Sequence, residues 1–167
     1  MLEVEKALNK FAKGVVRTSE SNLIRQGKRA SGSLYNSLDH ALEVFPNSFS
    51  LSFEMNKYGE FVDKGVSGKE KKYNTPYAFT NKMPPRKDIL KWVNRKRLRL
   101  RDNNGKFKKG GQESLAFLIQ RAIFKKGIKP SLFFTKAFEH HFSKLPKELE
   151  EAFALDIESF IEFTTRK

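Results

Sequence analysis

Asp63, Glu70 and Lys72 come nearest to a catalytic set in this sequence. Their Asp…Glu-x-Lys order is that of metal-dependent nucleases. Such a site needs two carboxylates at the end of paired buried strands, where they hold a divalent metal against a phosphate. Residues 69–74, which read KEKKYN, have no strand pattern. A nuclease is therefore the third functional hypothesis, and Asp63 is expected to be structural.

The other side chains able to do chemistry are three histidines, His40, His140 and His141. Adjacent residues on a helix point in different directions, and no nearby cluster supplies metal-ligand spacing. Phosphate-loop, dinucleotide-binding and hydrolase-elbow patterns are absent. Zero cysteines removes thiolate metal sites, disulfides and a cysteine nucleophile. The sequence thus predicts a protein that is not an enzyme and has no cofactor or metal.

Charge is distributed unevenly along the chain. The formal net charge is +14 and the pI about 10.0, which favours polyanions through long-range attraction and counterion release. Residues 86–109 hold eleven basic and two acidic residues, a net of +9, whereas 139–167 hold seven acidic and four basic, a net of −3. A basic middle and an acidic tail suit subunits that pack head to tail. The side chains expected to face DNA or an acidic partner, unless they form a merely solvated face, are Arg95, Lys96, Arg97, Arg99, Arg101, Lys106, Lys108 and Lys109.

The first third of the chain predicts two helices and then a strand pair. Apolar residues at helical spacing predict a helix over about 3–16, and Ser19 or Ser21 can cap a second one. The expected face of the second helix is Ile24, Gly27, Ser31, Leu34 and Leu38. The period then becomes two, which predicts a hairpin turning at Pro46-Asn47-Ser48. Its apolar strand residues are Leu42, Val44, Phe49, Leu51, Phe53 and Met55.

The middle of the chain predicts loops around one helix. Residues 58–68 indicate an aromatic loop and 69–74 a charged, mobile one. Pro84-Pro85 suits a helix start, because the first amides of a helix have no intrahelical partner, and the helix is expected to end near residue 97. Its expected buried side is Ile89, Leu90, Trp92 and Val93. Leucines then alternate with arginines before Asn104-Gly105, a pair suited to a type I′ turn. Residues 95–111 form either a basic hairpin arm or a disordered loop.

Three helical patterns close the chain. The cleanest stops at Gly127 and has Leu115, Leu118, Ile119, Ala122 and Ile123 on one face. Phe117 and Phe124 lie on its other side and are expected to contact a neighbouring subunit. A short phenylalanine-rich helix follows Pro130, and a long one follows Pro146. In the long helix, Leu155 and Phe163 fall outside the apolar stripe, which again predicts packing against another subunit.

These elements predict an α+β fold: two N-terminal helices, a small antiparallel β-sheet, and several C-terminal helices packed on it. The expected division is an α+β domain over 1–143, with its basic arm at about 95–111, and a C-terminal amphipathic helix over 144–167 that packs on the domain or on a neighbouring subunit. No apolar run approaches the roughly 20 residues of a membrane span, and the N-terminus is too polar for a signal peptide. A soluble protein without membrane contact is expected.

Three motifs in this order resemble the neck and tail-completion proteins that join head to tail in long-tailed double-stranded DNA phages. The first motif is Tyr58, Val62, Asp63, Gly65, Val66 and Gly68. The second is Pro84, Pro85, Ile89 and Trp92. The third is Gly127, Ile128, Lys129, Pro130, Phe133, Phe134 and Ala137. The likeness covers roughly residues 20–140, and the basic arm and the final helix depart from it.

The resemblance implies a structural virion protein, made in the host cytoplasm, that forms a homo-oligomeric ring at the neck or upper tail. Its implied neighbours are head-tail connector, portal-adaptor and tail-tube proteins, with non-specific contact to genomic DNA. The motif residues would be structural, because a joining protein needs only shape. The alternative is a DNA-binding or packaging accessory protein that grips phosphates with residues 95–109.

Overall fold

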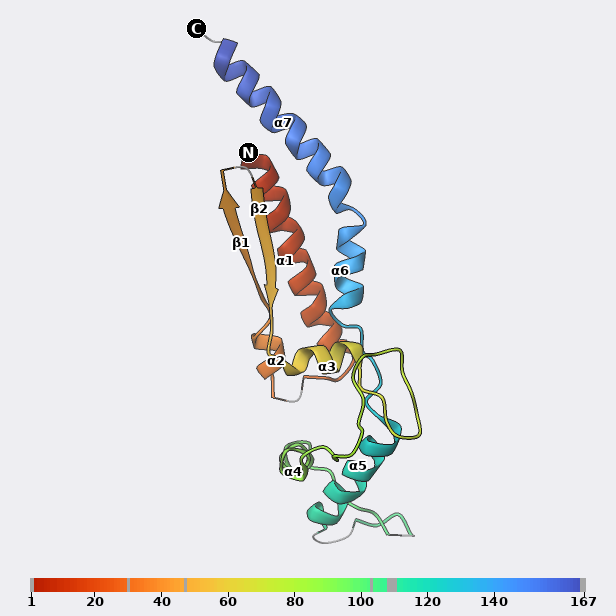
Figure 1. Cartoon of the computed structure of the whole chain (residues 1–167). Helices are drawn as coiled ribbons and strands as arrows, with labels where there is room; N and C mark the ends of the chain where they lie inside the picture. The colour runs from red at the N-terminus through yellow and green to blue at the C-terminus, as the bar shows by residue number, and fades with distance from the viewer. Residues whose placement is uncertain (1, 30, 47, 103, 108–110, 166–167) are drawn as a thin grey trace. The chain divides into compact units, whose positions relative to one another are not determined.

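The structure is a computed structural model that describes residues 2–29, 31–46, 48–102, 104–107 and 111–165, the last three by their backbone alone. The chain folds into two compact units. The first unit comprises Met1–Asn56 with Leu132–Lys167, and the second comprises Lys57–Ser131. Helices and one two-stranded antiparallel sheet make the chain α+β, as predicted (Figure 1).

The N-terminal helix α1 of the first unit is continuous over Leu2–Arg25, so the prediction of two helices broken near Ser19 is wrong. The Ser19 hydroxyl donates to the Val15 carbonyl oxygen at 2.7 Å, four residues back, and does not cap a new helix. Gly27, two residues after the end of the helix, has a φ of 64°. There the Gly27 amide donates to Ile24 O and the Lys28 amide to Leu23 O, both at 2.9 Å, which is a Schellman motif.

The first part of the second predicted helix belongs to α1, and of the remainder only the single turn α2, Ser33–Asn36, is helical. The hairpin follows as predicted, with β1 at Asp39–Phe45 and β2 at Ser48–Glu54 paired in a register that sets Leu42 opposite Leu51. Along β2, the serines are exposed and the three apolar residues between them are half-buried. The expected alternation is therefore present in β2 but not in β1, where Val44, predicted to be buried, is 52% exposed. Turn residue 47 lies outside the described residues, and Met55 lies beyond the strand.

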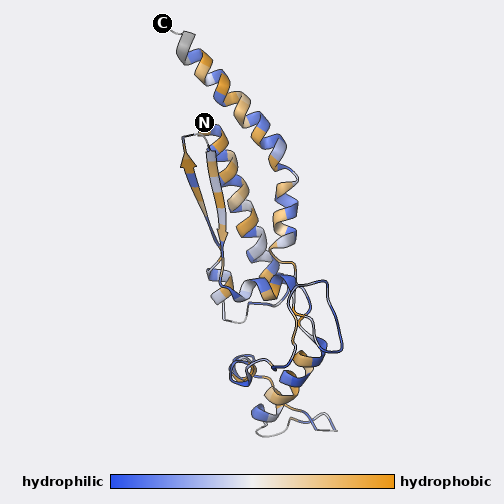
Figure 2. Ribbon diagram, in the orientation of Figure 1, coloured by the Kyte–Doolittle hydropathy of each residue, from blue (hydrophilic) through white to orange (hydrophobic). Residues whose placement is uncertain are grey.

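Helix α6, Thr135–Phe142, and helix α7, Leu145–Thr165, pack with the hairpin around α1 (Figure 1). At the centre, the Phe11 ring meets the Phe53 and Phe138 rings edge to face at 6.1 and 5.6 Å. The first turns of α7 bury Leu145 and Ala152. Apolar residues continue along the rest of this helix, as Figure 2 shows, and those at 153, 155 and 157 are 54%, 51% and 44% exposed.

The second unit contains α3, Tyr58–Lys64, α4, Arg86–Arg95, and α5, Gln112–Lys126. The prediction of a loop that begins at residue 58 is wrong, because Tyr58–Lys64 form the helix α3, which is followed by its C-cap residue Gly65. Its glycine and its aromatic and β-branched residues weaken the local helical signal. Helix α4 begins after the proline pair as predicted, but it ends two residues before the expected end at Arg97, which has a φ of 52°.

Helices α4 and α5 share a narrow core of Ile89, Val93 and Ala116. The partly buried residues around it are Leu90, Leu98, Leu115, Ile119 and Ile123. Trp92, predicted to be buried, is 41% exposed, and Leu118 and Ala122 are exposed as well. The small Ala116 side chain admits α4 closely, so the ten residues of α4 cover only one stripe of α5. No described helix has the length and apolar character needed to cross a membrane.

Candidate functional site

The first and third motifs meet inside the second unit. Val66 and Ile128 form an antiparallel bridge in which each amide donates to the other carbonyl oxygen, at 2.9 and 2.8 Å. Around this bridge the backbones leave no room for side chains. A Cβ atom on Gly65 would lie 2.6 Å from Ile128 O, and one on Gly68 would overlap the Lys125 carbonyl. Glycine is therefore required here by close backbone approach.

A second set of hydrogen bonds joins the same motifs at Ser131. The Ser131 hydroxyl donates to Val62 O at 2.6 Å, and its amide donates to Asp63 O at 3.0 Å. Asp63 is only 4% exposed and lies in α3. The third motif continues into the first unit, where Phe133 is fully buried and its carbonyl oxygen accepts a 2.9 Å hydrogen bond from Asn22 Nδ2.

The second motif is attached to α5. The Gln120 side chain donates to Pro84 O at 2.7 Å, and Pro85 is the N-cap of α4. This contact places the start of α4 beside the middle of α5. Parts of all three motifs therefore belong to one connected structure within the second unit. They are the first motif, the proline pair of the second motif, and Gly127 and Pro130 of the third.

The segment 69–74 has neither helix nor strand, as the loop prediction required, and it is hydrogen-bonded to the end of α5. The Lys69 amide donates to Phe124 O at 3.0 Å and the Glu70 amide to Lys125 O at 2.9 Å. These bonds satisfy carbonyl groups that have no partner inside a helix. The Glu70 carboxylate also pairs with Lys125 Nζ at 2.7 Å.

The nuclease hypothesis finds little support in this geometry. Asp63 is buried in a helix and Glu70 is engaged by a lysine, whereas the nuclease arrangement requires both carboxylates at the ends of paired strands. Among the described residues, no group of three or more histidine, aspartate or glutamate side chains is placed to hold a metal ion.

The basic segment, which is the part of the predicted arm from Arg95 to Phe107, contains a turn that is closed by one bridge. Arg101 pairs with Phe107, its guanidinium lies 4.5 Å from the centre of the Phe107 ring, and the Asp102 amide donates to Lys106 O at 2.8 Å. Of the two residues Asn104 and Gly105, Gly105 has a positive φ and Asn104 does not, so the predicted type I′ turn, which needs a positive φ at both, is wrong. Asp102 Oδ1 instead accepts the amides of residues 104 and 106, at 2.9 and 2.8 Å.

The candidate DNA-facing side chains are exposed wherever the structure describes them. Leu98 and Leu100 are half-buried, while the arginines between and around them are exposed, so the predicted separation of the two sides is present without a continuous strand. The exposed members are Arg95, Lys96, Arg97, Arg99, Arg101 and Lys106. Lys108 and Lys109 lie outside the described residues.

The predicted interface residues differ in their surroundings. Phe117 is 39% exposed, and the guanidinium groups of Arg86 and Arg121 lie 5.1 and 5.8 Å from the centre of its ring. Phe124 is half-buried against Phe79, with ring centres 6.4 Å apart. Leu155 is 51% exposed. The Phe163 side chain lies outside the described residues.

Sequence reasoning missed a cleft in the first unit. It has a volume of about 720 Å³ and lies between α1 and the end of α6 with the start of α7. Its cationic lining residues are Lys6, Lys10, Lys13, Arg17 and Lys144. The signal was available, because the four on α1 follow one another at intervals of four, three and four residues, which places them on one helix face.

His141 forms one wall of this cleft. Its Nε2 lies 2.9 Å from Thr18 Oγ1, and the ring occupies the space left by Gly14, whose Cβ would come within 2.8 Å of it. Burial lowers the pKa of His141, and the charges of His140 and Lys144 lower it further, against a smaller opposite effect of Glu148. The lowered pKa favours the neutral form of the imidazole beside these cations.

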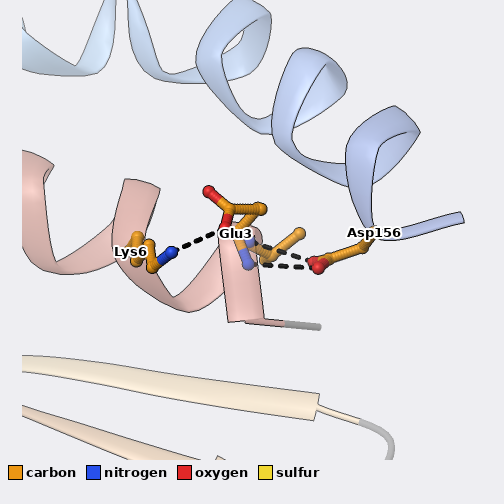
Figure 3. A network of polar contacts seen from close by, with 4 residues as sticks. Glu3, Lys6 and Asp156 are labelled. Carbon is orange, nitrogen blue, oxygen red and sulfur yellow. Dashed lines mark hydrogen bonds and ion pairs between the residues drawn. The ribbon is translucent and has the colours of Figure 1, made fainter. Parts of the chain in front are cut away.

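Helix α7 also caps α1. The Glu3 and Val4 amides donate to Asp156 Oδ1 and Oδ2, each at 3.1 Å (Figure 3). These are amides that lack intrahelical partners, and the carboxylate lies at the positive end of the helix dipole. Desolvation would raise the pKa of Asp156, but the two amide hydrogen bonds help to bring it below its ordinary value.

Comparisons with protein-family models, with curated proteins and with solved structures find no match to this chain. The likeness to neck and tail-completion proteins consequently rests on the three motifs and on their order in the sequence.

Proposed function

We propose that this chain is a structural virion protein that forms a ring at the head-tail junction of a tailed phage. The observation that carries the proposal is the joining of the motif segments around the Val66–Ile128 bridge. Residues more than sixty positions apart in the sequence support one another there, and they do so through backbone contacts and glycines. Motif residues that hold distant backbone segments together in this way suit a structural protein.

Exposed apolar side chains on two helices supply surfaces for ring contacts. On α5, Phe117 presents an aromatic ring between two arginines, a composition common at protein interfaces. On α7, Leu155 and its apolar neighbours are about half exposed in the single chain. A ring that buries these surfaces would remove apolar area from water.

The exposed basic side chains from Arg95 to Lys106 supply the electrostatic part of the proposal. They would face passing DNA or dock an acidic surface of the adjacent ring. Sequence-specific recognition is not expected, because a passage must tolerate every sequence that moves through it. The same side chains favour the alternative function, a DNA-binding or packaging accessory protein.

Electron microscopy of the purified protein, with its mass measured in solution, tests the proposal. Rings or stacked tubes would support a neck component. A protein that stays monomeric, and that neither forms rings with purified phage heads or tails nor restores joining of the two, would contradict it. Monomers with salt-sensitive DNA affinity would favour the accessory protein instead.

A further inference from the structure

The cleft along α1 is built from side chains that have no role in the proposed ring. Lys6 pairs with Glu3 at 2.6 Å and Lys10 with Glu148 at 3.0 Å. In contrast, no ion pair joins Lys13, Arg17 or Lys144 to a carboxylate anywhere in the part of the chain that the structure describes. Three of the five cations that line the cleft therefore have no ion-pair partner among the described residues, and the one carboxylate of the lining, Glu148, pairs with Lys10.

The row of cations on α1 has the dimensions of an extended polyanion. From Lys6 to Arg17 the helix rises about 16 Å, at 1.5 Å per residue. One strand of duplex DNA advances about 3.4 Å along the axis per phosphate, so such a row faces several consecutive phosphates. The side chains are accessible, since those of Lys6 and Lys10 are 60% and 73% exposed.

Five cations against one carboxylate, Glu148, give the lining a positive charge that favours an anionic ligand. Among the described side chains, no exposed large apolar one lines the cleft, and Phe11 in its lining is only 5% exposed. Protein interfaces depend on aromatic or aliphatic anchors, whereas nucleic-acid interfaces are polar and strongly positive. Arg17 adds a planar fork that matches phosphate oxygens, and Asn9 adds an amide donor.

We propose that the cleft lined by Lys13, Arg17 and Lys144 is a second, sequence-independent binding site for the phosphate backbone of DNA. It lies in the first unit, apart in sequence from the basic segment of the second. The inference does not depend on ring formation, since a phosphate site on α1 would act in a monomer as well as in an assembly.

His141 provides a reporter inside the site. The groups that face it are Thr18 and the α1 cations on one side, and His140, Lys144 and Glu148 on the other. Burial lowers its pKa most, and the charges of His140 and Lys144 lower it further, so a bound phosphate beside these charges should raise that pKa. A nuclear magnetic resonance titration of the imidazole would follow this change.

The test measures binding of the full-length chain to a fluorescein-labelled, mixed-sequence DNA duplex at several salt concentrations. The cleft variant carries Lys13→Gln, Arg17→Gln and Lys144→Gln. The control carries Arg29→Gln, Lys136→Gln and Lys147→Gln, exposed positions outside the cleft with the same loss of three charges. At 0.1 M salt the cleft variant should bind at least about a hundredfold more weakly, and its plot of log K against log [salt] should be shallower by about 2 to 3, while the control should change affinity less than about twofold.

Three results would overturn the proposal. One is an equal loss of affinity in the cleft and control variants, which would assign binding to net charge alone. Another is a His141 pKa that the duplex leaves unchanged in the unmodified protein. The third is tighter binding to an acidic polyglutamate peptide than to the duplex at equal salt, which would assign the cleft to a protein partner. Thermal unfolding of each variant verifies that the compared chains are folded.

Discussion

The backbones of Gly68 and Gly127 pass so close together that a Cβ atom on Gly127 would lie 2.6 Å from the Gly68 amide nitrogen. The same Cβ would overlap the Val66 carbonyl oxygen. Gly127 also has φ 74° and ψ −168°, a conformation that only glycine adopts readily. Two glycines nearly sixty residues apart thus permit the contact on which the second unit depends.

Replacing Gly127 with alanine should therefore destabilise the second unit strongly. The backbone conformation alone costs about 1–3 kcal/mol for a residue with a side chain, and the overlap adds to it. Chemical denaturation of the full chain measures the loss. Gly105→Ala is the matched control, because Gly105 also has a positive φ, 78°, but no atom within 4 Å of its Cβ position. Equal losses in the two variants would contradict a role for the close contact.

Local signals predicted a substantial part of this fold. The alternation in β2 and the helix start after Pro85 depend on neighbours in the chain, and both are present. The prediction of a helix break at Ser19 was wrong because the Ser19 hydroxyl has two possible partners, a downstream amide or the Val15 carbonyl. The sequence alone does not distinguish between them. The prediction of a loop at residues 58–64 was wrong because the local residues favour a helix only weakly. The helix that forms there is in contact with the distant Ser131, which no local pattern indicates.

The site was harder to predict than the fold. Exposure of the arginines at 97, 99 and 101 followed from their alternation with leucines. The exposure of Trp92 was not predicted, because its burial depends on how much of α4 is covered by α5. The cleft required α1 to lie beside Lys144, more than a hundred residues away, and no local pattern specifies that approach.

Asp156→Asn should weaken the contact between α7 and the start of α1, and the effect should depend on pH. The pKa of Asp156 is lower in the folded chain than its ordinary value of 3.8, so the ionised form favours folding. Its contribution is fully present above 3.8 and is lost as the pH falls through the lower folded value. Melting temperatures of both proteins should therefore differ at neutral pH and converge in strong acid.

The control for this experiment is Asp39→Asn. Asp39 lies at the start of β1 with its side chain 78% exposed, and it makes no contact with the end of a helix in the described structure. Its replacement should leave the melting temperature nearly unchanged across the same range. A constant difference between Asp156→Asn and the parent at every pH would show that the cap does not act through its charge.

Phe117→Glu should separate assembly from folding. The ring is 39% exposed in the single chain, so the substitution should lower the free energy of unfolding by only about 1 kcal/mol and leave the protein folded. In a ring interface the same carboxylate would be buried against apolar groups, which is strongly unfavourable. The expected protein is a folded monomer that does not form rings. Ala122→Glu, at another exposed position of α5, is the control and should assemble. Normal rings from Phe117→Glu would place the interface elsewhere.

Replacing Arg97, Arg99 and Arg101 together with glutamine tests the electrostatic part of the proposed function. All three are exposed, and Leu98 remains packed against the core of α4 and α5, so the fold should be retained. If these arginines face DNA or an acidic neighbour, particle assembly and DNA retention should fall at low salt. At high salt the parent should weaken toward the variant, because the Debye length shrinks from about 10 Å at 0.1 M to about 3 Å at 1 M. Parent and variant that match at every salt concentration would reduce the segment to a solvated turn. Ring formation through Phe117 would be unaffected by that outcome, so the mechanical and electrostatic parts of the proposal can fail separately.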